Sequence, residues 1–484
     1  MALILVLLFS LLIRLRGFTS HFTLSSDTAR DLLVAHGAII LNKIPWVGSF
    51  SSAGPFVFGP NWYWWLMFWR LITPNFFLAP WVGMLLLSVS FVLVMYLVGK
   101  IAVDKKFGLI LALLTGVSSQ VVALSAYLTQ HAMIEIFSGL ALLGIVGFVR
   151  SRRLPYVFLT SLSIGAALSM HYQAINLLVY LPILFLQEKP TLKRWVLIGL
   201  ISFLGLLIFL WPLFLWDSTR SFQNLTQLLY YFRVGQYRFW VSNRWLTYLG
   251  VFWPDYLAKF SGEKVVAILL VLSGGFLTLK QFVKGKLPKT IIWPLIIFGA
   301  QIFLLRYFRG EKYDGYLVYL HPVIILTIGW FLHNLLKINR WLGFSMFILI
   351  LVFNMKLNSP VLDWDNDAGK LKTMISEVSK IYPNSKFTVY ARGLSSSNCA
   401  YSFSALVQGE NKGDSFGIPL GICQNGLDDC GQPGAIKIDQ TVFQNESCSL
   451  VDLTKMNKFG LTKKNDWYNF SATAVYDDVQ NWWR

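Results

Sequence analysis

Apolar and polar segments alternate along the chain up to about residue 356. Helices that cross a bilayer need roughly 17–25 mostly apolar residues, and segments close to this length recur throughout. The first segment is shorter, but it lacks the basic start and small-residue cleavage site of a signal peptide, so we interpret it as a span. The pattern predicts eleven membrane-spanning helices, at about 2–15, 78–98, 107–126, 132–149, 155–170, 174–187, 195–215, 264–279, 290–307, 320–336 and 341–356.

The pattern changes after residue 356. Apolar residues at helical spacing predict a helix over Asp367–Ile381, and the segments KFTVYA and AIKIDQTVF alternate as strands do. We therefore predict a polytopic α-helical membrane protein with a small C-terminal α/β domain. Its transmembrane module covers residues 1–356 and its soluble domain covers residues 357–484.

Charge sets the expected orientation. Only 14% of the residues are charged and 55% are hydrophobic, yet the net charge is +18. The basic residues gather in short alternate loops, which the positive-inside rule places in the cytoplasm. The N-terminus is then cytoplasmic, and the C-terminal domain lies outside an integral cell (plasma) membrane. The excess of basic residues does not indicate nucleic-acid binding, because it forms no basic patch.

Two long segments and one shorter segment fall on the outer face, at 17–77, 216–263 and 308–319. The first contains DLLVAHGAII, which is amphipathic, and GPNWYWWLMFW, whose aromatic residues are typical of the headgroup region. The second is rich in arginine, which indicates either a solvated basic face or an anionic ligand. Sequons for N-glycosylation occur at Asn224, Asn445 and Asn469.

All four cysteines lie in the C-terminal domain. An even number confined to one hydrophilic segment indicates disulfides and an oxidising compartment. Three pairings exist, and the sequence does not choose between them. Zinc is the alternative, but the segment has neither the CxxC spacing nor the histidines of a zinc site. The disulfide candidates are Cys399, Cys423, Cys430 and Cys448.

An acidic cluster in the first outer loop is the first candidate for chemistry. Asp27 and Asp31 share one face if the segment is helical, and Arg30 reaches the same side. One carboxylate can act as general base for an acceptor hydroxyl, while an arginine neutralises phosphate charge. The alternative is structural, since Asp27 after Ser25-Ser26 is also a good helix N-cap.

Two further candidates sit at the outer ends of spans. For Glu135 the sequence leaves two alternatives. It is a second acid in the outer cavity, with His131 one turn away, or it forms a hydrogen bond to a neighbouring helix. His171, followed by Tyr172, is a binding residue or a histidine satisfied at the interface.

The third outer segment, YFRGEKYDGYLVYLHP, carries cations and aromatic residues together. Arg309, Lys312 and Tyr316 are candidates to bind a lipid-linked phosphate. The alternative is that the segment anchors the chain among headgroups. The three outer segments would converge on one cavity, open to a lipid carrier and to a hydrophilic acceptor.

Four motifs in this order resemble the integral-membrane glycosyltransferases of the GT-C fold, in particular the protein O-mannosyltransferase and lipid A aminoarabinose transferase group (glycosyltransferase family 39-like). The four motifs are RLRGF followed by SSDTARD, then GPNWYWWLMF, YLTQHAMIEIFSGLALL and FRGEKYDGYLVYLHP. The resemblance implies transfer of a hexosyl or pentosyl group from a polyprenyl-phosphate donor to a cell-envelope glycan, lipid or protein.

By this resemblance Asp27 is the catalytic carboxylate, supported by Asp31 and Arg30, and Arg309 and Lys312 bind the donor phosphate. Where protein O-mannosyltransferases carry an adjacent acidic pair, this chain has Asp27-Thr28, so the acceptor class stays open. No cofactor is firmly indicated, although Asp27, Asp31 and Glu135 could bind a divalent metal.

Two other functions fit the same features. A transporter or flippase of lipid-linked sugars would also have many spans and basic outer loops, but its charges should lie near the bilayer midplane. A polymerase or ligase of lipid-linked oligosaccharides would act on the same face and transfer larger units.

Overall fold

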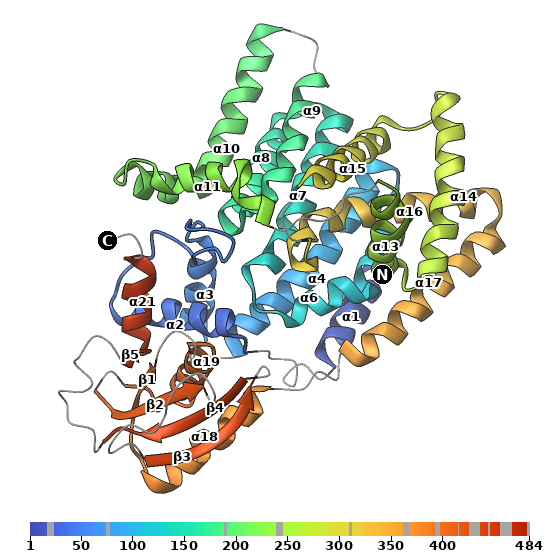
Figure 1. Ribbon diagram of the computed structural model, residues 1–484. Coiled ribbons are helices and arrows are strands. Elements are labelled where there is room, and N and C mark those ends of the chain that lie inside the picture. Colours follow the sequence, from blue (N-terminus) through green and yellow to red (C-terminus); the bar gives the residue numbers. More distant parts are fainter. Residues whose placement is uncertain are drawn as a thin grey trace. The chain divides into compact units, whose positions relative to one another are not determined.

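The computed structural model describes residues 1–16, 24–73, 78–187, 191–238, 245–308, 312–361, 367–392, 397–414, 416–424, 436–443, 446–454 and 467–481 (Figure 1). Packing divides the chain into two units. The helical unit comprises Met1–Phe18, Phe50–Gly59 and Met84–Asp363, and the mixed unit comprises Thr19–Ser49, Pro60–Gly83 and Trp364–Arg484.

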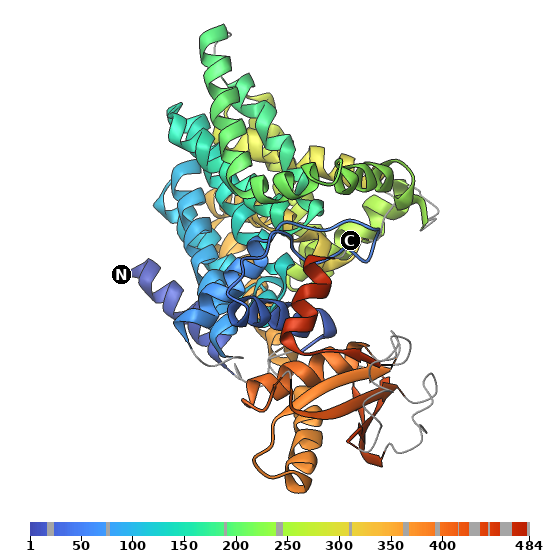
Figure 2. The same ribbon diagram turned by 90° about the vertical axis from the view of Figure 1, so that its left-hand side faces the viewer.

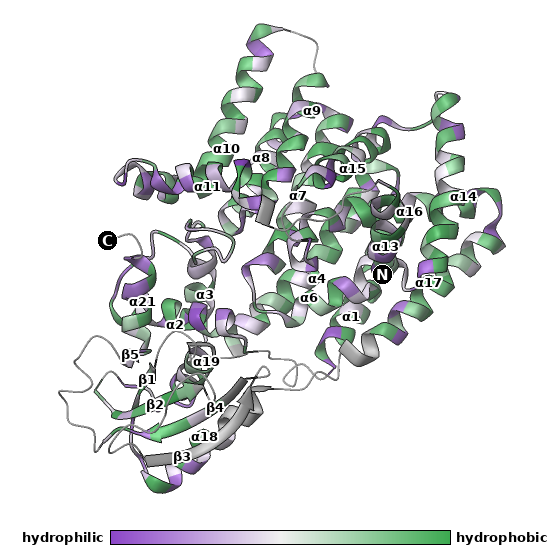
Figure 3. Ribbon diagram, in the orientation of Figure 1, coloured by the Kyte–Doolittle hydropathy of each residue, from purple (hydrophilic) through white to green (hydrophobic). Residues whose placement is uncertain are grey.

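Seven helices within the described residues are long and apolar enough to cross a membrane. In Figure 3 most of the length of α10 and α14 is coloured as hydrophobic. The seven are α4 (Leu78–Ala102), α7 (Gln130–Ser151), α10 (Leu192–Ser218), α14 (Lys264–Val283), α15 (Lys289–Tyr307), α16 (His321–Ile338) preceded by the 3-10 helix η5 (Asp314–Leu320), and α17 (Arg340–Val361).

An eighth apolar segment is bent. Helices α5 (Lys105–Val117) and α6 (Ser119–Ala126) meet at 54° around Ser118. The backbone N–H of Ser119, which the break frees, donates to Asn354 Oδ1 of α17 at 2.9 Å. A side chain from a neighbouring helix thus satisfies a backbone group that lipid could not.

Three shorter apolar segments complete the agreement with the predicted positions: α1 (Ala2–Leu15), α8 (Leu154–Met170), and the 3-10 helix η2 (Tyr172–Tyr180) continued by α9 (Leu181–Leu186). The prediction of a polytopic helical membrane protein is confirmed. The segment 216–263 is not an open loop, since it folds into α11 (Gln223–Arg233), η3 (Gly235–Arg238), α12 (Trp245–Thr247), the π-helix η4 (Tyr248–Phe252) and α13 (Trp253–Ser261).

The mixed unit contains the predicted α/β fold. Within the described residues its sheet has five strands in the order β3-β4-β2-β1-β5; β1 and β2 pair in parallel, and the other neighbouring strands pair antiparallel. Helix α18 (Asp367–Ile381) lies beside β3 (Figure 2). The strands are β1 (Phe387–Arg392), β2 (Ile418–Gln424), β3 (Ile436–Phe443), β4 (Glu446–Asp452) and β5 (Trp467–Asn469). Both predicted strands and the predicted helix are present.

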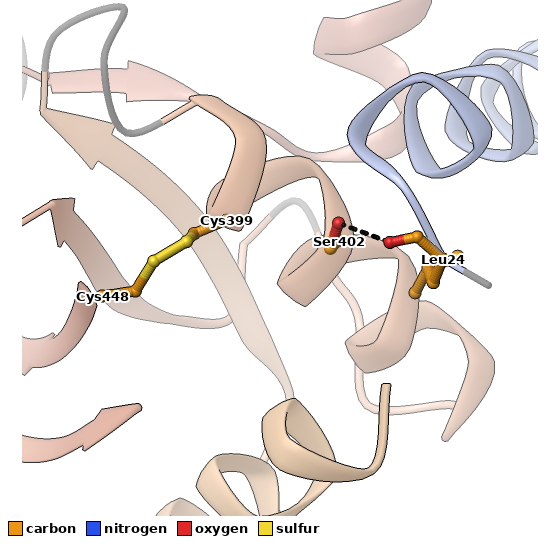
Figure 4. The surroundings of a disulfide bond; sticks show 4 residues. All are labelled: Leu24, Cys399, Ser402 and Cys448. Atoms are coloured by element: carbon orange, nitrogen blue, oxygen red, sulfur yellow. Dashed lines mark hydrogen bonds between the residues drawn. A yellow bond between two sulfur atoms is a disulfide. The ribbon is translucent and has the colours of Figure 1, made fainter. Parts of the chain in front are cut away.

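Two helices of the first outer loop, α2 (Ser26–Ile40) and α3 (Asn61–Ile72), belong to this same unit. Helix α2 packs against α19 (Ser397–Gly409) and α21 (Ala472–Gln480). A Cβ at Gly37 would lie 2.2 Å from the carbonyl oxygen of Ala472, so only glycine permits this approach. Ser402 Oγ donates to the carbonyl of Leu24 at 3.1 Å, just before α2 (Figure 4).

Of the four predicted disulfide candidates, Cys399 and Cys448 form a disulfide that links α19 to β4 (Figure 4). Their Cα atoms are 6.6 Å apart, within the range that a disulfide requires. Cys423 is buried in β2, and Cys430 lies outside the described residues. The pairing of these two cysteines stays a prediction.

We expect the Cys448→Ser variant to unfold at lower temperature than the wild type, because the bridge closes a loop between residues 49 positions apart. Loss of such a bridge costs about 2–5 kcal/mol of unfolding free energy. Thermal unfolding of the purified full chain, with and without reductant, measures this. A wild type that reductant does not destabilise would contradict the prediction.

Candidate active site

The acidic cluster lies in the first two turns of α2. Ser25 is the N-cap and its hydroxyl accepts from the backbone N–H of Thr28 at 3.2 Å. Asp27 therefore does not cap the helix, and that alternative is wrong. Its side chain is 75% exposed in the first turn, where the helix dipole favours a negative charge. Asp27 is thus an accessible carboxylate without a capping role.

Arg30 connects the two carboxylates, as its spacing predicted. Its Nη1 donates to Asp27 Oδ1 at 2.7 Å, and its Nε and Nη2 donate to Asp31 Oδ1 at 3.0 and 2.9 Å. The side chains of Arg30 and Asp31 are buried, with 8% and 6% exposed. Burial works to lower the pKa of Arg30, but Asp31 and then Asp27 outweigh it and raise that pKa. Arg30 therefore stays charged beside Asp27.

Asp31 also joins α2 to α3. Trp62 Nε1 donates to Asp31 Oδ2 at 2.8 Å, and the Tyr63 hydroxyl donates to Oδ1 at 3.2 Å. Both aromatic side chains are fully buried. Burial raises the pKa of the Asp31 carboxyl, and the Arg30 guanidinium offsets part of that rise. Asp31 thus holds Arg30, and Arg30 orients Asp27.

This cluster does not fit a divalent cation. A metal bridging Asp27 and Asp31 would need the place where the Arg30 guanidinium already bonds both carboxylates. Within the described ranges, no three histidine, cysteine or carboxylate side chains converge as metal ligands would.

Glu135 lies in the helical unit, where it is buried in α7. Its Oε1 is 2.6 Å from Nδ1 of His321, the first residue of α16. His321 Nε2 is in turn 3.2 Å from the hydroxyl of Tyr256 in α13. Three helices are linked through buried polar groups, which corresponds to the structural alternative considered for Glu135. The ring of His131 instead packs against His171, with centroids 4.5 Å apart.

A cavity of about 390 Å³ opens in the helical unit among η2, α11, α15 and η5. The predicted binding residues His171 and Tyr316 line it, with ring centroids 5.3 Å apart. Its other lining residues are Ser51, Ser52, Ala53, Phe56, Tyr172, Gln173, Ile175, Asn176, Leu228, Tyr231, Phe232, Gln236, Leu304, Leu305, Tyr307, Phe308, Leu317 and Tyr319.

Of the two predicted phosphate-binding cations, the structure describes Lys312, which contacts this wall. Lys312 Nζ donates to the carbonyl of Phe308, a lining residue, at 2.9 Å. Arg309 lies outside the described residues. The guanidinium of Arg306 instead stacks over the Trp245 ring at 4.8 Å, an arrangement typical of a cation–π contact.

A hydrogen-bond network fixes one side of the cavity. Asn224 Oδ1 accepts from the backbone N–H of Val57 at 2.7 Å, and its Nδ2 donates to the Tyr172 hydroxyl at 3.0 Å. Tyr172 donates to the carbonyl of Val57 at 2.7 Å. The Asp217 carboxylate accepts from the backbone N–H groups of Asn224 and Leu225, and so caps α11. The buried amide of the Asn224 sequon is therefore structural.

We expect Asn224→Ala to destabilise the protein by about 1–3 kcal/mol, because it leaves the Val57 N–H without its acceptor. We also expect no glycan at Asn224 in a host that glycosylates. Thermal unfolding and intact mass measure the two effects. Thr226→Ala, which removes the sequon but keeps the Asn224 side chain, should unfold close to the wild type; equal losses in both variants would contradict the network.

Solved structures share the fold of this chain over nearly its whole length. The crystal structure of ArnT from Cupriavidus metallidurans in the apo state superposes with a TM-score of 0.62 and 10% identity, over 93% of this chain and 98% of that one. The chain has the GT-C fold. The same ArnT bound to undecaprenyl phosphate superposes with a TM-score of 0.60 and 11% identity, over 93% and 97% of the two chains.

A second GT-C protein also superposes on this chain. AglB, the oligosaccharyltransferase from Archaeoglobus fulgidus, in complex with an inhibitory peptide and a dolichol-phosphate, gives a TM-score of 0.51 and 10% identity, over 99% of this chain and 77% of that one. No family model matches the sequence, and no curated protein sequence matches it.

On this GT-C scaffold, sequence reasoning missed two connections. Trp62 and Tyr63 were interpreted as interfacial anchors, whereas they bind Asp31. The Asn-Trp-Tyr run after Gly59-Pro60 is the signal for this contact, because a tryptophan and a tyrosine that are buried at the start of a helix need hydrogen-bond partners. The second connection is between Glu135 and His321, two polar residues at the ends of apolar segments that lie far apart in the sequence.

Proposed function

We propose that this protein is a membrane glycosyltransferase that transfers a sugar from a polyprenyl-phosphate donor to an acceptor at the extracytoplasmic face. The observation that carries the proposal is the exposed Asp27 carboxylate, oriented by a buried Arg30–Asp31 pair on a GT-C fold. A carboxylate held in this way is prepared to accept a proton at a fixed position.

In the proposed reaction, Asp27 is the general base. It takes the proton of the acceptor hydroxyl or amide as that group attacks the anomeric carbon of the sugar. The bond between this carbon and the phosphate oxygen breaks, and polyprenyl phosphate leaves with the electron pair. The products are the glycosylated acceptor and polyprenyl phosphate, and Asp27 later returns its proton to water.

The other predicted residues have supporting roles in this proposal. Asp31 and Arg30 are positioning residues, because both are buried and Arg30 bonds Asp27 directly. Glu135 positions His321, to which it is hydrogen-bonded. Lys312 and Arg309 offset the charge of the leaving phosphate, since a cation placed on developing charge lowers the barrier.

The identity of the donor is supported by the ligands of the two fold relatives. ArnT was solved with undecaprenyl phosphate and AglB with a dolichol-phosphate, both long isoprenoid phosphates. The proposed acceptor is a cell-envelope glycan, a lipid or a protein. The distribution of basic loops and the Cys399–Cys448 disulfide both support an extracytoplasmic C-terminal domain.

The test uses the purified full chain in detergent with added lipid and radiolabelled polyprenyl-phosphate sugars. We expect release or transfer of the labelled sugar, with stoichiometric appearance of polyprenyl phosphate. A transporter would bind the same compounds and move them across proteoliposomes without cleaving the sugar–phosphate bond. Movement without cleavage would overturn the transferase proposal.

A further inference from the structure

The described wall of the 390 Å³ cavity differs in charge from the neighbouring segment that carries the proposed phosphate-binding cations. None of its described lining residues carries a carboxylate, an ammonium or a guanidinium group. Burying an unpaired charge in such a wall is costly, because nothing replaces the lost water. The described part of this wall therefore suits an uncharged ligand group.

The wall is nevertheless polar at many points. Eleven of its twenty lining side chains end in a hydroxyl, an amide or an imidazole group, among them Ser51, Gln173, Asn176 and Tyr316. An isoprenoid chain placed here would remove water from those of these groups that the protein does not already bond, and it would return no hydrogen bonds. Hydroxyl groups of a ligand would replace those bonds, and the aromatic rings would cover its apolar face.

One wall residue, Gln173, has a further group that can accept a hydrogen bond. Gln173 Nε2 donates to the carbonyl of Gly315 at 3.0 Å, which fixes the side chain, while its buried Oε1 has no hydrogen-bond partner within the described part of the chain. A small rotation of the amide would let Oε1 accept from a ligand hydroxyl. Asn176 lies nearby on the same 3-10 helix and is held by the Tyr319 hydroxyl at 2.9 Å.

We infer that this cavity is the sugar subsite and that it selects an uncharged, hydroxylated sugar, with Gln173 and Asn176 in its wall as specificity-determining residues. The inference rests on the proposed function, because the cavity would receive the sugar of the polyprenyl-phosphate donor. It separates the donor of this protein from donors whose sugar carries an amino or a carboxylate group.

The experiment measures displacement of radiolabelled polyprenyl phosphate from the full-length protein. The competitors are polyprenyl phosphate itself and polyprenyl phosphates carrying a neutral hexose, an aminopentose or a hexuronic acid. We expect the hexose compound to bind at least about tenfold more tightly than either charged compound. Gln173→Glu places a carboxylate in the wall. This variant should bind the hexose compound more weakly than the wild type does and the aminopentose compound more tightly.

A control variant and a second test variant accompany this experiment. Gln187→Glu makes the same change outside the cavity, beside Arg152, and should leave the order of affinities unchanged. Asn176→Asp repeats the test at a second wall position if Gln173→Glu does not fold. In each variant, binding of plain polyprenyl phosphate reports whether the phosphate site persists.

Three outcomes would overturn the inference. Equal or tighter binding of a charged compound to the wild type would do so and leave the transferase proposal standing, as long as that compound is turned over. Equal affinity of plain and hexose-bearing polyprenyl phosphate, unchanged by both wall variants, would place the sugar elsewhere. No binding of any polyprenyl phosphate would overturn the proposed function and the subsite with it.

Discussion

The Asp27→Asn variant should fold normally and lose about 10²- to 10⁴-fold in kcat, the range that a positioned general base supplies. The amide keeps the size of the side chain and its oxygen can still accept from Arg30, but it does not take a proton from an acceptor. Because the Asp27 side chain is 75% exposed, its replacement should leave the unfolding temperature nearly unchanged. Steady-state transfer from a radiolabelled polyprenyl-phosphate sugar measures the loss.

Asp477→Asn is the matched control for this variant. Asp477 is also an exposed aspartate of the mixed unit, 54% exposed and 3.9 Å from Lys43 Nζ. The Asp477→Asn substitution removes the same charge from the same unit as Asp27→Asn does. This control variant should transfer sugar at the wild-type rate. If Asp27→Asn retains wild-type kcat, the assignment of Asp27 as base is refuted.

The Asp31→Ala variant should lose stability as well as activity. It would leave the buried Arg30 guanidinium without its main carboxylate partner, and Trp62 Nε1 without its acceptor. Removing one partner of a buried ion pair costs about 3–5 kcal/mol of unfolding free energy. Asp27 remains within reach of Arg30, which places the expected loss at the lower end. Thermal unfolding of the purified protein, followed by tryptophan fluorescence, measures it.

A second substitution separates the charge from the packing. Arg30→Met combined with Asp31→Leu removes both buried charges, and such replacements are often neutral or stabilising. We expect the double variant to regain much of the stability lost in Asp31→Ala but not the activity, because nothing then orients Asp27. If the Asp31→Ala variant is as stable as the wild type, the stability of the protein does not depend on the Arg30–Asp31 ion pair.

Local sequence patterns predicted the parts of the fold that depend on local physics. Hydropathy located the apolar helices, and alternation located β1 and β3, because burial of one face repeats with the period of the backbone. The spacing of Asp27 and Arg30 correctly predicted their contact, since side chains three residues apart lie on one helix face.

The remaining features depend on residues that only the fold brings together. Asp31 and Trp62 are 31 residues apart, and Glu135 and His321 are 186 apart. No periodicity relates such positions. The disulfide partner of Cys399 was equally open, because three pairings satisfy the same composition. The packing of α2 on α19 and α21 was missed for the same reason.

That packing has a consequence for synthesis at the ribosome. Helix α2 is made well before α19 and α21, which cover it; the hydrogen bond from Trp46 to Gln480 joins residues 434 positions apart. At roughly 5–20 residues per second, the early helix waits about 20–90 s for its cover. A chain that stops before α19 would therefore leave the α2 helix, which carries Asp27, without the two helices that pack on it.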